Sequence, residues 1–363
     1  MKTLTTRAAF AALSALVAIF AIPARAQDSV TLYGVVDAYG QYVSGSSHLY
    51  RLQSGGTGGS RFGLRGQEDL GDGLYAVFVL ESGINIDDGT NAQNAFWGRQ
   101  AYVGLRSKTW GQLTLGRQYS SLFYATTDFS EFSNLPAGPS TGVIGGFAGY
   151  EPVRGTTDSA AGNGGPIRVN NSGRYESPEW NGLRGGVLVG LGEVSGGTRD
   201  NRLLDLWGHY GAGPVTLTLS VLDDKGGPIK ANAARRTTTI AATYAFDSWR
   251  AVGGYLNVND RSEADQDGSG WWLGADYRFG AQRVKVQYVQ SKPKYLADAK
   301  TQAFGVGWEY SLSKRATLYS SLTRFKNDDH AGTGRASFAL PTGITTSSDN
   351  DITELSGGLR FTF

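Results

Sequence analysis

The 363-residue chain has 34 basic and 32 acidic residues, no cysteine and a single methionine, the initiator. The absence of cysteine excludes a fold held together by disulfides. The near balance of charge gives no support to nucleic-acid binding. If residues 1–26 are removed, three basic residues and no acid are lost, so that 34 − 3 = 31 basic residues stand against 32 acidic ones, a net charge of −1.

The first 26 residues have the pattern of an export signal. Lys2 and Arg7 form a basic start, residues 8–21 are apolar apart from Ser14, and Ala24-Arg25-Ala26 is a small-residue cleavage site. The apolar run is too short for a spanning helix, so a retained membrane anchor is the weaker alternative. We expect a cleaved signal peptide over residues 1–26 and one mature domain over residues 27–363. No later segment has the ~18 consecutive apolar residues of a transmembrane helix.

The rest of the chain repeats segments in which apolar and polar residues alternate. In the last segment the two classes fall on opposite parities. The apolar set is Leu355, Leu359, Phe361 and Phe363, and the polar set is Glu354, Ser356, Arg360 and Thr362. Such alternation predicts β-strands with one apolar and one polar face. About sixteen segments of this kind are present, an even number. They begin near residues 29, 59, 74, 97, 111, 168, 183, 201, 213, 234, 249, 269, 282, 300, 315 and 351.

Three features favour a membrane barrel over a soluble sandwich, whose strands also alternate. Charged residues such as Arg283 and Lys285 lie in mid-strand on the polar face, as expected of a wet interior. Tight connections such as Asp247-Ser248 and Gly280-Ala281 alternate with long polar loops. Aromatic residues gather at strand ends on the apolar face, as in an interfacial girdle. We assign to this girdle, or to subunit contacts, Trp97, Trp110, Trp207 and Trp249.

A barrel of about sixteen strands is too wide for side chains to fill and encloses an aqueous channel. It must close, because an open sheet edge would leave backbone groups unpaired in hydrocarbon. The sequence therefore predicts an all-β, transmembrane antiparallel β-barrel of the outer membrane, through which ions and small hydrophilic solutes diffuse passively. The predicted lumen-facing residues outside the constriction are Arg65, Arg174, Arg283, Lys285 and Arg360.

Several motifs, in their order and spacing, resemble the Gram-negative general diffusion porins of the β-proteobacterial type. They are residues 30–34 (VTLYG), 60–66 (SRFGLRG), 68–73 (EDLGDG), 99–105 (RQAYVGL), 115–119 (LGRQY), 174–178 (RYESP) and the terminal Phe363. The resemblance covers the whole mature chain. It implies a homotrimer in outer-membrane lipid and lipopolysaccharide, with Phe363 as a signal for the barrel-assembly machinery.

In that family the third loop folds back into the pore and places acids opposite arginines of the wall. Residues 119–166 correspond to this loop, with Asp128 and Glu131 as the matching acids. The matching wall residues are Arg61, Arg99 and Arg168. Val35 stands where related porins carry a lysine, which implies a less basic wall there. The resemblance thus implies a constriction in which the two acids face the three arginines.

Strand parity gives a separate test of the arginines. Arg61 and Arg65 alternate with Phe62 and Leu64, so they are predicted to face the lumen. Arg168, Asn170, Ser172 and Arg174 share one parity, opposite to Val169 and Tyr175, and the same prediction follows. Arg99 shares parity with Ala101, Val103 and Leu105, so its placement rests on the resemblance alone.

Two other functions fit parts of the sequence. A sugar-selective porin would expose a ladder of aromatic rings along the channel. The candidates for that ladder are Phe123, Tyr124, Phe129 and Phe132. An outer-membrane barrel hydrolase would pair a rim histidine, such as His48 or His330, with Ser or Asp.

We predict no metal site, no cofactor and no enzymatic activity. The three histidines, His48, His209 and His330, lack ligand spacing. Asp87-Asp88 and residues 327–329 lack the alternating oxygen ligands and glycine of a calcium loop. The glycine-rich runs have no βαβ context that would make them phosphate loops.

Overall fold

The computed structural model describes residues 29–93, 95–133, 135–139, 167–193, 195, 202–225, 235–261, 267–295, 297–328 and 351–363. The predicted signal peptide, residues 140–166 of the third loop and His330 lie outside these residues. Within them, no helix is long and apolar enough to cross a membrane.

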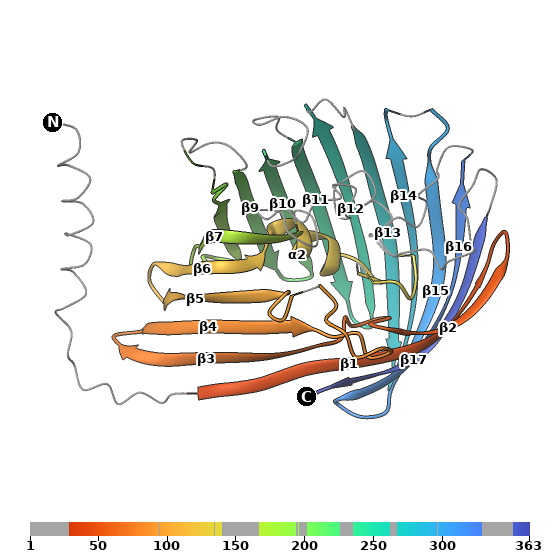
Figure 1. The fold of residues 1–363 in the computed structure, drawn as a ribbon, viewed down its shortest axis with the longest axis horizontal. Helices are drawn as coiled ribbons and strands as arrows, with labels where there is room; N and C mark the ends of the chain where they lie inside the picture. Colours follow the sequence, from red (N-terminus) through yellow and green to blue (C-terminus); the bar gives the residue numbers. More distant parts are fainter. Residues whose placement is uncertain are drawn as a thin grey trace.

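The described chain forms one antiparallel sheet that closes on itself. Its strands are β1 (Ser29–Ser44), β2 (His48–Ser54), β3 (Arg61–Gly71), β4 (Leu74–Gly83), β5 (Gln100–Ser107), β6 (Gly111–Tyr119), β7 (Arg168–Glu176), β8 (Leu183–Gly190), β9 (Leu203–Ala212), β10 (Val215–Asp224), β11 (Arg235–Phe246), β12 (Trp249–Asp260), β13 (Gly268–Phe279), β14 (Gln282–Pro293), β15 (Thr301–Ser311), β16 (Ala316–Asn327) and β17 (Ile352–Thr362). The short helix α2 (Ser121–Thr127) lies inside the curved wall (Figure 1). The first strand, β1, pairs with the last, β17, so the wall has no free edge there.

Seventeen strands occupy sixteen positions in the wall, because β2 and β3 share one. Both strands pair with β1. β2 pairs with the half of β1 from Ala38 to Ser44, and β3 pairs with the half from Ser29 to Val35. With 17 − 1 = 16 positions, the predicted sixteen-stranded antiparallel barrel is confirmed. Residues 55–60 interrupt the shared strand, and the carboxylate of Asp37 accepts hydrogen bonds there from Gly56 N (3.2 Å), Thr57 N (2.9 Å) and Gly58 N (2.7 Å).

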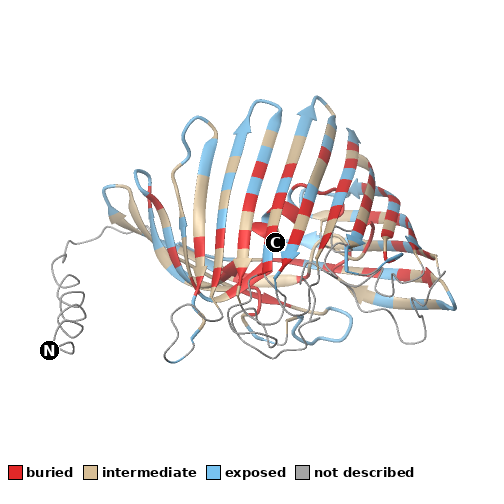
Figure 2. Ribbon diagram, turned by 90° about the horizontal axis from the view of Figure 1, so that it is seen from above, coloured by how far each residue is buried: buried red, intermediate tan, exposed pale blue. Residues whose placement is uncertain are grey.

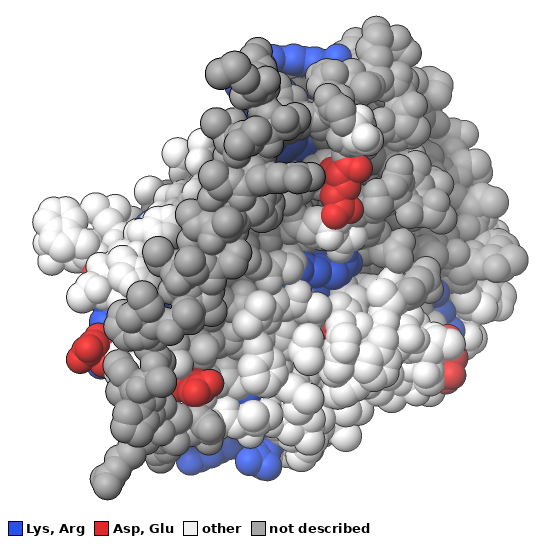
Figure 3. Space-filling view, turned by 60° about the vertical axis from the view of Figure 1, so that its left-hand side comes forward, with Lys and Arg blue, Asp and Glu red and all other residues white. Residues whose placement is uncertain are grey.

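The alternation read in the sequence is the alternation of the two barrel faces. Buried and exposed residues stripe the strands in Figure 2. On β13, Leu273 is 60% exposed on the outer face, whereas Trp272 and Asp276 of the opposite parity are buried. The described surface in Figure 3 is mostly uncharged, with charged side chains in separate small patches. An apolar outer face of this kind suits a barrel surrounded by lipid.

Two predicted orientations are wrong. Trp110 and Trp249 are exposed, as a girdle requires, but Trp207 pairs with Gly186 and Ser220 on the inward face of β9. Its neighbours Leu206 and Tyr210 take the outer face instead. The parity of β9 was ambiguous in the sequence, because both alternating sets contain apolar residues.

The parity prediction for the start of β7 also fails. The register between β6 and β7 shifts at Gly116/Gln118, and Asn171 has a positive φ of 47°. This bulge changes which side chains face inward. Val169 is therefore buried in the interior cluster with Leu122 and Leu188, although its parity predicted an outward position.

Candidate functional site

The third loop enters the barrel directly after β6. Its helix, α2, contacts β6, β9, β10 and β11. Asp205 on β9 is buried and accepts a hydrogen bond from the Ser121 backbone N–H at 2.7 Å. The loop also has an apolar seat on the inward faces of β8 to β14. This seat consists of Leu188, Leu203, Leu222, Leu256, Val258 and Val289, which form one buried cluster with Leu122 and Phe129 of the loop. The apolar residues on the inward faces thus contact the loop, and their presence is consistent with a water-filled lumen.

Beyond α2, the loop crosses to the far wall and on to the interruption between β2 and β3. Trp272 donates its indole N–H to the Phe129 carbonyl at 2.6 Å. Gln287 accepts from Glu131 N at 2.7 Å and donates to the Pro139 carbonyl at 2.6 Å. Ala137 N donates to the Gly56 carbonyl at 3.1 Å. The described part of the loop therefore narrows the interior at the level of these contacts.

The three predicted wall residues of the constriction come together in the structure. We call Arg61, Arg99 and Arg168 the arginine cluster. Glu81 on β4 lies at its centre, with Arg99 Nε 2.7 Å and Arg61 Nε 3.6 Å from its carboxylate. Arg99 and Arg168 both lie against the ring of Tyr119, at 5.8 and 5.4 Å from its centroid. Tyr119 also donates its hydroxyl to Glu81 at 3.0 Å.

The position of Arg99 explains why strand parity could not assign it. β5 begins at Gln100, so Arg99 precedes the paired segment and is not bound by its alternation. Its backbone N–H donates to the Glu81 carbonyl at 3.1 Å, and its buried side chain turns to the Glu81 carboxylate. Arg61 remains the most open member of the cluster, with 28% of its side chain exposed.

Glu131 of the loop contacts a different part of the wall from the arginine cluster. Its carboxylate forms ion pairs with Arg283 and, at 3.4 Å, with Arg250. Its backbone carbonyl accepts a hydrogen bond from Lys285 at 3.2 Å. The surrounding ion pairs are Arg283–Asp276 at 2.9 Å, Arg283–Glu309 at 3.6 Å and Lys285–Glu309 at 2.6 Å. We call the six residues Glu131, Asp276, Glu309, Arg250, Arg283 and Lys285 the anchor network.

Glu131 therefore forms its ion pairs with Arg250 and Arg283, outside the arginine cluster, and the expectation that both loop acids face that cluster across the pore stays a prediction. Asp128 is exposed, its carboxylate accepts from the Thr127 hydroxyl at 3.2 Å, and its carbonyl accepts from Arg250. Both acids lie toward β12 and β14 because the loop is held by the apolar seat and by Gln287. Sequence reasoning missed Glu81, Arg250, Asp276 and Glu309, whose signal was a charged residue inside a predicted strand.

The other predicted lumen residues lie on inward faces by their register. Arg65 is 5.4 Å from the ring of Tyr33, and Arg360 donates to the Thr57 hydroxyl at 3.2 Å. Arg174 donates to the Tyr119 carbonyl at 2.9 Å and pairs with Glu176 at 3.2 Å. Arg283 and Lys285 belong to the anchor network described above.

The sugar-selective alternative finds little support in the described residues. Phe129 and Phe132 are buried and Phe123 stacks on Tyr119 at 3.8 Å, so Tyr124 alone of the four candidate rings is exposed. One exposed ring is not a sugar-binding ladder. Over the described part of the chain, no three His, Asp or Glu side chains gather to form a metal site.

Comparisons with known proteins agree with this architecture. The family described as Gram-negative porin matches residues 12–330. Outer membrane porin protein 32 of Delftia acidovorans is 32% identical over 320 residues, which cover 86% of this chain and 88% of the Delftia chain. An outer membrane porin protein of Bordetella pertussis is 29% identical, over 86% of this chain and 93% of its own. The solved anion-selective porin from Comamonas acidovorans superposes with a TM-score of 0.75 at 27% identity, covering 93% of this chain and all of that one.

Proposed function

This chain belongs to the Gram-negative porin family, and we propose that its channel passes anions more readily than cations. As a porin it forms a water-filled channel of the outer membrane for passive diffusion of ions and small hydrophilic solutes. The anion preference is supported by the uneven charge of its interior. The arginine cluster has three positive charges against Glu81 alone, 3 − 1 = +2. In the anchor network three bases balance three acids, 3 − 3 = 0.

The single observation that carries the proposal is that the loop acid Glu131 is neutralised by Arg250 and Arg283. Glu131 therefore does not offset the positive wall formed by the arginine cluster. Similarity to the anion-selective porin from Comamonas acidovorans points in the same direction. The test is the reversal potential of the purified protein in a planar bilayer under a KCl gradient. A potential of the sign for chloride preference supports the proposal, and one of the opposite sign contradicts it.

The preference should also depend on pH through Glu131. Burial raises the pKa of this carboxyl to about 7, while the guanidinium groups of Arg283 and Arg250 oppose the rise. Protonation below pH 7 removes a negative charge and makes the interior more positive. We expect anion preference to grow about tenfold from pH 8 to pH 6, since one charge near a solute path in water is worth about 0.7 kcal/mol and acts with opposite sign on an anion and a cation. Glu131→Gln should show the low-pH preference at both values; a variant with the wild-type pH response would contradict the assignment.

The protein should be isolated as a detergent-extracted trimer that begins at Gln27. The supporting observations are the apolar outer face, the small-residue cleavage site and the family resemblance. On an SDS gel, unheated protein should migrate as a trimer and boiled protein as a monomer, with Gln27 as the N-terminal residue by sequencing. A soluble monomer without detergent would contradict the assembly. We also propose that lipopolysaccharide and the barrel-assembly machinery are partners of the barrel and that the barrel has no catalytic role.

A further inference from the structure

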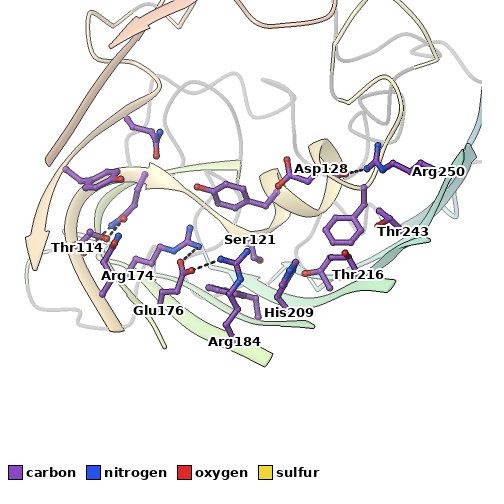
Figure 4. Close-up of a pocket in the computed structure, with 18 residues that line it drawn as sticks. Thr114, Ser121, Asp128, Arg174, Glu176, Arg184, His209, Thr216, Thr243 and Arg250 are labelled. Carbon is purple, nitrogen blue, oxygen red and sulfur yellow. Dashed lines mark hydrogen bonds and ion pairs between the residues drawn. The ribbon is translucent and has the colours of Figure 1, made fainter. Parts of the chain in front are cut away.

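A cavity of about 470 Å³ lies between α2 and the inward faces of β5–β12. It is at the end of the barrel where short connections join the strands. Glu176 and Arg184 lie on either side of the 177–182 connection, and Thr216 follows the turn that begins at Gly213 (Figure 4). Since short connections face the periplasm in barrels of this type, a solute would meet the cavity on the periplasmic side of the third loop. Its volume is in the range of small-molecule sites.

One end of the cavity has more positive than negative charge. Glu176 is shared by two guanidinium groups, those of Arg174 and Arg184, each at 3.2 Å (Figure 4). Arg174 is mostly buried, whereas 41% of the Arg184 side chain is exposed. An exposed guanidinium beside an already shared carboxylate can bind a further carboxylate through two parallel N–H donors.

The rest of the lining is mostly polar, but it includes the aromatic rings of Tyr102, Tyr124, Phe129 and Trp207. The Arg174 guanidinium lies 5.2 Å from the rings of both Tyr124 and Trp207, so one face of each ring is already polarised by a cation. Phe129 and His209 meet edge to face at 6.2 Å on the far side.

From this arrangement we propose that the cavity is a binding subsite for small aromatic carboxylates. The carboxylate pairs with Arg184, and the ring lies against Tyr124 and Phe129. A short aliphatic anion would gain the ion pair without the ring contacts, so it would bind less tightly. The proposal rests on the channel function, because a solute reaches the cavity through the lumen.

The test is current block in planar bilayers that contain the whole trimer, with benzoate as the probe. We expect benzoate added on the periplasmic side to reduce the KCl current with a saturable concentration dependence. Three control solutes each lack one feature of benzoate. Acetate has the charge but no ring, cyclohexanecarboxylate has the charge and the size but no aromatic face, and benzyl alcohol has the aromatic ring but no charge. Each should need at least about tenfold higher concentration, which corresponds to 1.4 kcal/mol.

Two variants and a matched control locate the site. Arg184→Gln and Tyr124→Leu should each raise the half-blocking benzoate concentration about tenfold, the loss of one good contact. Arg278→Gln removes the same charge at the same end of the barrel from a side chain that is 63% exposed and lies outside the cavity. It should leave the block unchanged.

Block that does not saturate, or that Arg278→Gln weakens as much as Arg184→Gln, would overturn the subsite. Equal block by cyclohexanecarboxylate would show that the cavity selects size and charge but not aromatic character, and would overturn the proposal as stated. The KCl reversal potential is measured on the same membranes without benzoate. It tests the anion preference separately, so failure of one proposal can be distinguished from failure of the other.

Discussion

Replacing Arg61 and Arg168 with serine is expected to remove most of the anion preference. The two side chains supply two of the three positive charges of the arginine cluster, while Glu81 keeps its 2.7 Å partner Arg99. We leave Arg99 in place because loss of a buried ion-pair partner destabilises a fold by about 3–5 kcal/mol. Two charges at about 6 Å from a permeating ion in water stabilise an anion by about 1.4 kcal/mol and destabilise a cation by the same amount, which is about a hundredfold in the anion-to-cation permeability ratio.

The measurement is the reversal potential in dilute KCl, repeated near 1 M. The shift should shrink at high salt, where the screening length falls to about 3 Å. The matched control is the double variant Arg65→Ser/Arg106→Ser. It removes the same charge from two inward residues that lie against Tyr33 and Tyr75 and that, among the described residues, form no ion pair with Glu81. A shift of equal size in the control would mean that total lumen charge, and not the arginine cluster, sets selectivity.

Deletion of Phe363 is expected to prevent most of the protein molecules from assembling in the membrane. Phe363 joins the seam between the first and last strands, because its N–H donates to the Gly34 carbonyl at 3.1 Å and its carbonyl accepts from Gly34 N at 3.0 Å. Loss of two such bonds costs about 1–3 kcal/mol. Its ring lies over Gly34, where an added Cβ would come within 2.4 Å of the ring. Packing against the Phe363 ring therefore explains why the VTLYG motif has a glycine at position 34.

Comparing Phe363→Ala with the deletion separates the seam from a signal read by the assembly machinery. Phe363→Ala retains the two backbone hydrogen bonds and loses only the ring. If the ring is the signal, this variant should assemble poorly in cells yet refold in detergent with nearly wild-type yield. The deletion should fail in both settings. Phe361→Ala, which removes an outward ring of the same strand, serves as the control and should assemble normally. Wild-type trimer yield from the deletion would refute both roles.

The sequence by itself determined the architecture. Alternation with a period of two is a local property, set by the geometry of each strand, and it needs no knowledge of the partner strand. The last strand shows this: Leu355, Leu359 and Phe361 are exposed on the outer face, and Glu354 and Ser356 are buried on the inner one, as predicted. The motifs around Arg61, Arg99 and Arg168 also identified residues that the fold brings together.

The tertiary structure decided what each charge contacts. Glu131 is 152 residues from Arg283 and 119 from Arg250, and the register that brings them together depends on every strand between. A bulge next to β6 turned Val169 inward, and an apolar seat on the inner wall holds the loop so that Glu131 pairs with Arg250 and Arg283 outside the arginine cluster. These outcomes follow from packing between distant segments. A one-residue change of register moves a side chain to the other face, so no local pattern could have determined them.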